Sequence, residues 1–283
     1  MSFFSQSGHW YTVTDGTIAS AHDLDLRSAR LVNAFPSITT VLKERANGAL
    51  DTWKQDQLFQ AMVAHPYKGD NLEQYKRFIS ELASKKGTDA ADFGTRLHDA
   101  LDIYPQMTLD PDLAPYVEAF APSYDAIVLE RVSSEIMLAD SDVGIAGRTD
   151  LVAVTKDHGL SIIDYKTSKF RNGKAAFWDS YKIQLAFYAK CYQKQFNLKK
   201  PPRIINCGIN SEEPMAPQWK VYTEEEQEQA YKEFMCIAYL WFSTKKYWPM
   251  SDKVWPEERK KYNAAREEKA ADKPVKKTTK KKG

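Results

Sequence analysis

Two aspartates and a lysine stand inside stretches that otherwise have the apolar composition of buried β-strands. The stretch "GIAGRTDLVAVTKDHGLSIIDYKTSKF", residues 144–170, has an apolar run on each side of a polar turn. Asp150 lies in the first run, Asp164 in the second, and Lys166 follows two residues later. Paired carboxylates can bind a divalent cation, and a nearby ammonium group can stabilise negative charge on a phosphate. Metal-assisted chemistry on a phosphate is therefore the first hypothesis.

A β-hairpin over residues 147–168 would bring these groups together if its turn centres near Asp157. Side chains alternate along a strand, so the groups would share one face. The facing pairs would be Arg148 with Lys166, Asp150 with Asp164, Val152 with Ile162, and Val154 with Leu160. The opposite face would carry Leu151, Ala153, Ile163 and Tyr165, which are also largely apolar. The hairpin is thus predicted to be buried on both faces, with a charged cluster at one end.

Two carboxylates in directly opposed positions repel one another and destabilise a sheet. A proton shared by the two acids would relieve this repulsion, and so would a bound divalent cation. Oxygen-only ligands suit Mg²⁺ or Mn²⁺. A surface cluster of salt bridges at a strand end is the structural alternative.

The elements around the hairpin predict an α/β fold with a central mixed β-sheet flanked by helices and an N-terminal helical lobe. Four regions are predicted from the pattern: strands and turns over 1–35, a helical lobe over 36–125, the core over 126–255, and a charged, disordered tail over 256–283. Within them, Ser37 is expected to cap the first helix of the lobe. Residues 178–196 and 224–247 are expected to form helices of the core.

Charge and cysteine content exclude several classes of protein. The net charge of +2 conceals a tail, 251–283, with 12 basic and 6 acidic residues, so the rest of the chain is net acidic. Three cysteines without CxxC spacing make a disulfide framework, a structural zinc site or an iron–sulfur cluster unexpected. No apolar stretch reaches the length of a membrane span. We therefore expect a protein of a reducing cytoplasm with no membrane partner.

The combination "GRTDLV" and "DYKTS" resembles the D…(D/E)xK signature of the PD-(D/E)XK nuclease superfamily, and more narrowly its RecB-like exonuclease branch. Upstream, "FGTRLHDALD" resembles the helix of that branch which carries a glycine and a histidine. Downstream, "YKIQLAFYAK" resembles its QxxxY helix. Residues 35–54 are also similar to mitochondrial genome maintenance exonucleases and their phage relatives. The resemblance spans about residues 35–250 and implies a restriction-endonuclease-like core.

The resemblance also implies roles for individual residues. Asp150 and Asp164 would hold Mg²⁺ or Mn²⁺ together with the backbone carbonyl of Tyr165, and Lys166 would be the catalytic lysine. His98 would be a further metal ligand or a contact to the scissile phosphate; the alternative is a polar residue beside an apolar helix stripe. Gln184 and Tyr188 would order the lysine or touch DNA, and Arg148 would be a further supporting residue. Glu135 would be a metal ligand or a solvated strand residue. Trp53 and Tyr104 would stack on bases or pack in the core.

The resemblance implies divalent-metal-dependent hydrolysis of DNA by an exonuclease that acts on ends or single strands. It would serve phage or bacterial recombination, repair or replication, in the bacterial cytoplasm or a phage-infected host. A structure-selective endonuclease of the same fold and a catalytically idle DNA-binding or assembly module are the alternatives. The chain lacks helicase motifs, so a helicase or a single-strand-binding protein is a candidate partner.

Overall fold

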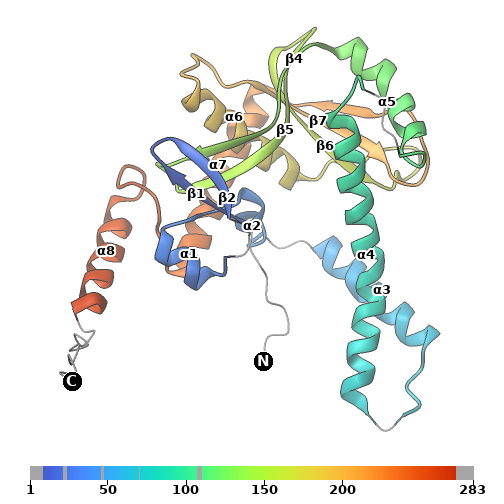
Figure 1. Cartoon of the computed structure of the whole chain (residues 1–283), viewed down its shortest axis with the longest axis horizontal. Coiled ribbons are helices and arrows are strands. Elements are labelled where there is room, and N and C mark those ends of the chain that lie inside the picture. Colours follow the sequence, from blue (N-terminus) through green and yellow to red (C-terminus); the bar gives the residue numbers. More distant parts are fainter. Residues whose placement is uncertain (1–8, 22–23, 46–47, 70, 107–109, 272–283) are drawn as a thin grey trace, which may run out of the picture. The chain divides into compact units, whose positions relative to one another are not determined.

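The structure is a computed structural model that describes residues 9–21, 24–45, 48–69, 71–106 and 110–271. The chain divides into two compact units, and Figure 1 labels their helices and strands. Unit 1 comprises residues 1–41, 137–147 and 235–283, and unit 2 comprises 42–136 and 148–234. Strands β4 and β5 and helix α7 contribute residues to both units.

Unit 1 contains a three-stranded antiparallel sheet in the order β2-β1-β3. Its strands are β1 (Trp10–Thr14), β2 (Thr17–Ala21) and β3 (Phe35–Pro36), and its helices are α1 (Leu26–Val32), most of α2 (Ile38–Leu42) and α8 (Pro256–Ala271). Ser37 Oγ accepts a hydrogen bond from the Thr40 N–H at 3.0 Å, so it caps α2 as predicted. Trp10 packs edge-on against Trp241, with the ring centroids 6.1 Å apart.

Two segments of unit 1 differ from the prediction. Residues 1–35 were expected to hold only strands and turns, but α1 forms there because Asp25 accepts a hydrogen bond from the Ser28 N–H at 2.7 Å and so caps the helix. Residues 256–283 were expected to be disordered, but α8 occupies 256–271. Acids at 257 and 258 begin this helix, and good helix formers follow them. The lysine-rich remainder, 272–283, lies outside the described residues.

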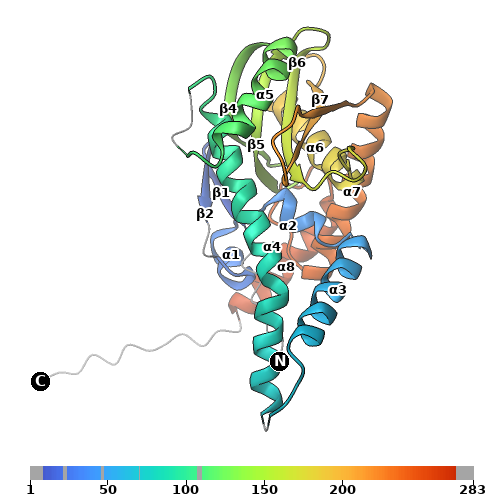
Figure 2. The ribbon, with the colours of Figure 1, turned by 90° about the vertical axis from the view of Figure 1, so that its right-hand side faces the viewer.

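Unit 2 begins with helices that precede the central sheet. Helix α3 (Gly48–Ala64) lies alongside α4 (Leu72–Asp102), a single continuous helix of 31 residues (Figure 2). Asn71 caps α4 by accepting a hydrogen bond from the Gln74 N–H at 3.0 Å. Helix α5 (Ala114–Ile127) follows and leads directly into the central sheet. The long α4 therefore carries its C-terminal turns, with His98, to the sheet.

The central sheet is mixed, with the strand order β4-β5-β6-β7-β8. The strands are β4 (Val128–Asp140), β5 (Ile145–Thr155), β6 (Gly159–Ser168), β7 (Arg203–Asn210) and β8 (Gln218–Val221). Strands β5 and β6 form an antiparallel hairpin, β6 and β7 are parallel, and β7 and β8 are antiparallel. Parallel strands need a crossover connection, and α6 (Asp179–Gln195) supplies it and packs against both. This arrangement confirms the predicted fold class.

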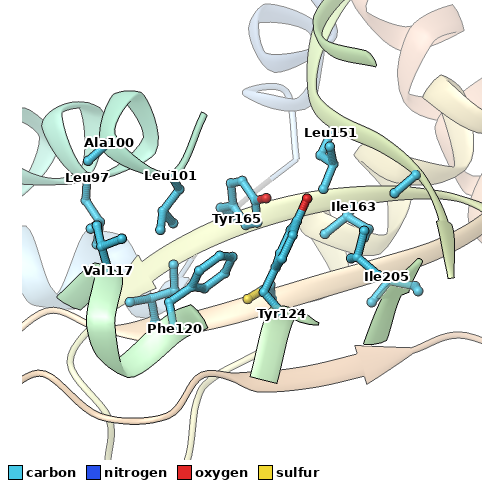
Figure 3. Close-up of a cluster of buried hydrophobic side chains, with 14 of the residues drawn as sticks. Leu97, Ala100, Leu101, Val117, Phe120, Tyr124, Leu151, Ile163, Tyr165 and Ile205 are labelled. Atoms are coloured by element: carbon cyan, nitrogen blue, oxygen red, sulfur yellow. The ribbon is translucent and has the colours of Figure 1, made fainter. Parts of the chain in front are cut away.

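The hairpin has the predicted register. Val152 pairs with Ile162 and Val154 with Leu160, so the turn lies at residues 156–158. The face opposite the acids packs into the main hydrophobic cluster of unit 2, where rings and aliphatic side chains of α4, α5 and the sheet meet (Figure 3). Residues of that cluster include Leu97, Val117, Phe120, Leu151, Ile163 and Tyr165. Helices α4 and α5 thus cover this face of the sheet, and α6 covers the other.

Helix α7 (Glu224–Lys245) follows β8, and Thr223 and Glu226 cap its start reciprocally. Within the described part of the chain, no helix is both long enough and apolar enough to cross a bilayer.

Candidate active site

The two predicted acids lie where the β5–β6 ladder ends. Backbone pairing runs up to Leu151 and Ile163, one position short of Asp150 and Asp164. Beyond that point, the carboxylate of Asp150 accepts a hydrogen bond at 2.7 Å from the backbone N–H of Tyr165. The Asp150 side chain on β5 therefore accepts the backbone hydrogen bond of Tyr165 on β6. This bond fixes the Asp150 carboxylate on the strand that carries Asp164.

The carboxylate of Asp164 is buried, and both of its oxygens accept hydrogen bonds. Lys166 Nζ lies 2.7 Å from Oδ1, and Asn206 Nδ2 lies 2.8 Å from Oδ2. Tyr222 in turn donates its hydroxyl to Asn206 Oδ1 at 2.9 Å. Burial raises the pKa of Asp164 to about 6; Lys166 opposes this rise and Asp150 adds to it. The carboxylate is thus held by two hydrogen bonds in a place where its charge is unfavourable even beside the Lys166 ammonium group, so a further cation would stabilise it.

Lys166 is placed by two side chains of α6. Gln184 Oε1 lies 3.5 Å from Lys166 Nζ, and Gln184 Nε2 donates to the hydroxyl of Tyr188 at 3.3 Å. The ring of Tyr181 lies 5.1 Å from the same ammonium group, within cation–π range. Burial lowers the pKa of Lys166, but the two neighbouring carboxylates raise it above its usual value. The lysine is therefore a fixed cation.

The spacing of Gln184 and Tyr188 places both on one face of α6, as the sequence indicates. Tyr188 is only 2% exposed, so it reaches the site through Gln184 and does not lie on the surface. Of the two roles expected for this pair, the contacts favour ordering the lysine over touching DNA.

His98 comes to the acids from α4. Its Nδ1 lies 3.8 Å from Asp150 Oδ2, and its ring meets the ring of Tyr165 edge-on at 5.8 Å. Burial lowers the pKa of His98, and the charge of Lys166 lowers it further. The imidazole is therefore neutral near pH 7, which is the form that can bind a metal or accept a proton.

Glu135 and Arg148 form an ion pair beside the acids, with 2.5 Å between Glu135 Oε2 and Arg148 Nε. Glu135 has a φ of 52° within β4, a strained value for a non-glycine residue. Burial raises its pKa and Arg148 opposes the rise. Backbone pairing of β5 with β6 does not extend to Arg148, so this arginine contacts Glu135 and does not form the predicted pair opposite Lys166.

The two aromatic residues proposed for stacking have contacts within the helices. The Tyr104 hydroxyl donates to the Asp125 carboxylate at 2.8 Å, and its ring packs edge-on against Tyr124 at 5.2 Å. Trp53, on α3, is partly exposed, and its ring lies against the backbone of Gly87 on α4. Tyr104 thus packs against an aromatic residue of α5, whereas Trp53 remains partly exposed on α3.

The donors at this site suit a hard divalent cation. Among the described residues, no three side chains of His, Cys, Asp or Glu converge on one point. The carboxylates of Asp150 and Asp164 are nevertheless close enough to influence one another, and Mg²⁺ commonly takes one or two carboxylates and completes its shell with water and substrate phosphate. The raised pKa of Asp164 shows that this position would gain from such a charge. The carboxylates of Asp150 and Asp164 therefore fit Mg²⁺ or Mn²⁺, and the Tyr165 carbonyl stays a prediction from the resemblance.

Three contributing residues were missed by the sequence reasoning: Asn206, Tyr222 and Tyr181. Asn206 is fully buried in β7, pairs in register with Asp164 and orients its carboxylate. A polar residue in the apolar run "RIINCGIN" was the available signal, because buried amides need a partner. The sequence around Tyr222 and Tyr181 contains no comparable signal.

Comparison with known protein families matches residues 71–274 to the PD-(D/E)XK nuclease superfamily. The match covers well over half of the chain and includes both acids, the lysine and the α6 pair. The chain belongs to this superfamily. Membership supports nuclease activity and implies DNA as the substrate. The predicted superfamily is confirmed.

Solved structures match the chain only weakly. The crystal structure of SSO0001 is 15% identical with a TM-score of 0.31, covering 68% of this chain and 87% of its own. A crystal structure of a candidate exonuclease from Eubacterium rectale is 10% identical with a TM-score of 0.35, covering 64% and 70%. At these values neither structure adds to the identification. The comparison with curated proteins gives no match.

Proposed function

We propose that this PD-(D/E)XK nuclease is a DNA exonuclease that depends on Mg²⁺ or Mn²⁺ and acts on ends or single strands. The observation that carries the proposal is the pair formed by buried Asp164 and partly buried Asp150, with Lys166 bonded to Asp164 at 2.7 Å. A salt-bridge cluster on the surface would not need buried acids. The structural alternative to a metal site is therefore weakened.

The chain's own residues would do three things in hydrolysis. Lys166, held by Asp164 and Gln184, would stabilise the negative charge that grows on the phosphate oxygens. Asn206 would keep the Asp164 carboxylate in one orientation. The N–H of Tyr165 would do the same for Asp150.

A divalent cation at Asp150, Asp164 and the Tyr165 carbonyl would supply Lewis acidity toward the phosphate and would lower the pKa of a bound water. His98, neutral and 3.8 Å from Asp150, would contact this cation or the scissile phosphate. Glu135 is held by Arg148, so a role as a metal ligand would require that ion pair to open.

The exonuclease assignment rests on the sequences of the motifs, because "GRTDLV", "DYKTS" and the Gln184–Tyr188 spacing resemble those of the RecB-like branch. A role in phage or bacterial recombination, repair or replication belongs to the same proposal. So do a cytoplasmic location and a helicase or single-strand-binding protein as partner.

A digestion time course tests the proposal directly. End-labelled single-stranded and double-stranded DNA would be incubated with Mg²⁺, with a closed circular DNA as control. We expect release of short products from the linear DNAs and an intact circle. Cleavage of the circle would indicate an endonuclease, and binding without cleavage would indicate an idle DNA-binding module.

A further inference from the structure

The segment that joins β6 to α6, residues 169–178, carries basic and aromatic side chains for which the proposed chemistry has no role. Between residues 169 and 182 the chain has four basic side chains and one acidic side chain. This surplus contrasts with the net acidic composition of residues 1–250. We call residues 169–178 the β6–α6 loop.

The loop contains a tight two-residue turn that sets two cations side by side. The N–H of Arg171 donates to the carbonyl of Lys174 at 3.0 Å, and the reverse bond is 3.1 Å. Asn172 and Gly173 between them have φ values of 52° and 71°, as a type I′ turn requires. Directly opposed like charges are unfavourable. Among the described residues neither Arg171 nor Lys174 forms an ion pair, so an anion between them would be favourable.

The loop is fastened to the central sheet at the level of Lys166. Gln218 on β8 donates to the carbonyl of Gly173 at 2.7 Å and accepts from the N–H of Ala175 at 3.0 Å. Gly208 on β7, which pairs in register with Lys166, lies under the loop. A Cβ added at Gly208 would lie 2.7 Å from the Cβ of Ala175, so only glycine permits this approach.

The loop covers the same face of the sheet as the acids. Gly208 is two residues after Asn206, so both positions face the same side. Asn206 bonds the carboxylate of Asp164, which fixes that side as the catalytic one. The cationic turn is therefore held beside the site by the sheet itself.

Trp178 ends the β6–α6 loop and is the residue from which α6 begins. It is 47% exposed, although a tryptophan is usually largely buried. Among the described residues its ring has no aromatic partner and no hydrogen bond. Its carbonyl accepts from the N–H of Tyr181 at 3.0 Å, and the ring of Tyr181 contacts Lys166. One helical turn thus separates the exposed indole from the residue that touches the catalytic lysine.

The surroundings of Trp178 are cationic as well. Asp179 is shared by Arg45 at 3.1 Å and Lys182 at 3.6 Å, so one acid faces two bases. An exposed indole among fixed cations is the combination that binds unpaired nucleic acid, because bases stack on the ring while phosphates meet the charges.

We propose that the β6–α6 loop holds a single-stranded stretch of the DNA substrate next to the scissile phosphate. Arg171 and Lys174 contact backbone phosphates, and an unpaired base stacks on Trp178. The inference rests on the proposed function, because it names the form of substrate which that site accepts. A base inside a duplex is stacked on its neighbours and cannot lie on the indole, so the loop selects a frayed end or a single strand.

The test measures binding separately from cleavage. Fluorescence anisotropy with a labelled oligothymidylate and a blunt duplex of equal length would be recorded with Ca²⁺ in place of Mg²⁺. We expect Trp178→Ala to weaken single-strand binding about tenfold, within the range for loss of one stacked base, and to leave duplex binding near the wild-type value. Trp178→Phe should retain most of the affinity. In Mg²⁺, Trp178→Ala should raise KM for single strands and leave kcat nearly unchanged.

The cations are tested by salt dependence. The double variant Arg171→Ala/Lys174→Ala should lower the slope of log affinity against log salt by about 1.4, because each phosphate contact on a single strand contributes about 0.7. The matched control is Lys199→Ala/Lys200→Ala. It removes two exposed lysines just before β7 begins, at the end of that strand away from Gly208.

The outcomes separate the two proposals. Suppose that the wild-type protein cleaves DNA. If Trp178→Ala then loses single-strand and duplex affinity equally, or loses neither, the loop inference alone is overturned. A slope change of the same size in the lysine control would also overturn it. A folded wild-type protein that neither binds nor cleaves DNA would overturn the proposed function itself.

Discussion

Replacing Asp164 by asparagine should remove activity and at the same time stabilise the metal-free protein. Asparagine has the shape of the protonated acid but cannot ionise. The pKa of Asp164 is raised to about 6 by burial, against about 3.9 for an unfolded aspartate. A difference of about two pKa units corresponds to about 3 kcal/mol. The ion pair with Lys166 is already included in this figure.

The sign follows from proton binding. A raised pKa means that the folded protein holds the Asp164 proton more tightly than the unfolded chain does. The contribution to the free energy of unfolding is therefore fully present below about pH 4 and is lost as the pH rises through about 6. At pH 8 without metal, the Asp164→Asn variant should be more stable than wild type by up to about 3 kcal/mol. Near pH 4 the two proteins should be equal.

Thermal unfolding in EDTA between pH 4 and 8 measures this difference, which should reach about 6–12 °C in Tm at pH 8. Added Mg²⁺ should raise the Tm of wild type more than that of the variant. Single-turnover cleavage in Mg²⁺ should fall by at least about a thousandfold, because a ligand of the cation is lost. Asp157→Asn, in the exposed turn of the same hairpin, is the matched control.

Two results would refute this reasoning. If the variant were less stable than wild type at pH 8 and kept the same dependence on pH, Asp164 would not be a carboxylate whose charge the fold opposes. If it cleaved DNA at the wild-type rate, Asp164 would not belong to the catalytic site.

Four further predictions concern the same site and the tail. Lys166→Met should lower kcat by about 10²–10³-fold while DNA binding in Ca²⁺ persists, and lost binding would contradict a purely catalytic role. Gln184→Ala should lower kcat by about tenfold, since the lysine loses one contact, and an unchanged kcat would remove Gln184 from the site. Mg²⁺ or Mn²⁺ should support cleavage and Ca²⁺ suppress it, because calcium holds its ligands further out; full activity in EDTA would disprove metal dependence. Deleting residues 273–283, which contain six lysines and lie outside the described residues, should flatten the salt dependence of DNA binding but leave the saturated rate unchanged. Superimposable salt plots would indicate that these lysines serve solubility.

The sequence by itself determined the hairpin and its chemistry. Alternation along two apolar runs predicted that Val152 faces Ile162, and the structure has this register. The same alternation placed Asp150 and Asp164 on one face, and the four-residue spacing placed Gln184 and Tyr188 on one side of a helix. These inferences depend on periods of two and 3.6 residues, which are properties of the local chain.

The tertiary structure decided how these residues are held. Asn206 orients Asp164 only because β7 pairs with β6 after a crossover of more than thirty residues, and no local pattern specifies that partner. The bond from the Tyr165 N–H to Asp150 likewise replaces a backbone pair that alternation alone would predict. The β6–α6 loop lies beside Lys166 because Gly208 leaves room for it. A glycine in a strand predicts that another segment approaches closely, but it does not indicate which segment. Local periodicity thus indicates the residues proposed to carry the chemistry, whereas packing between distant segments sets their distances, burial and pKa values.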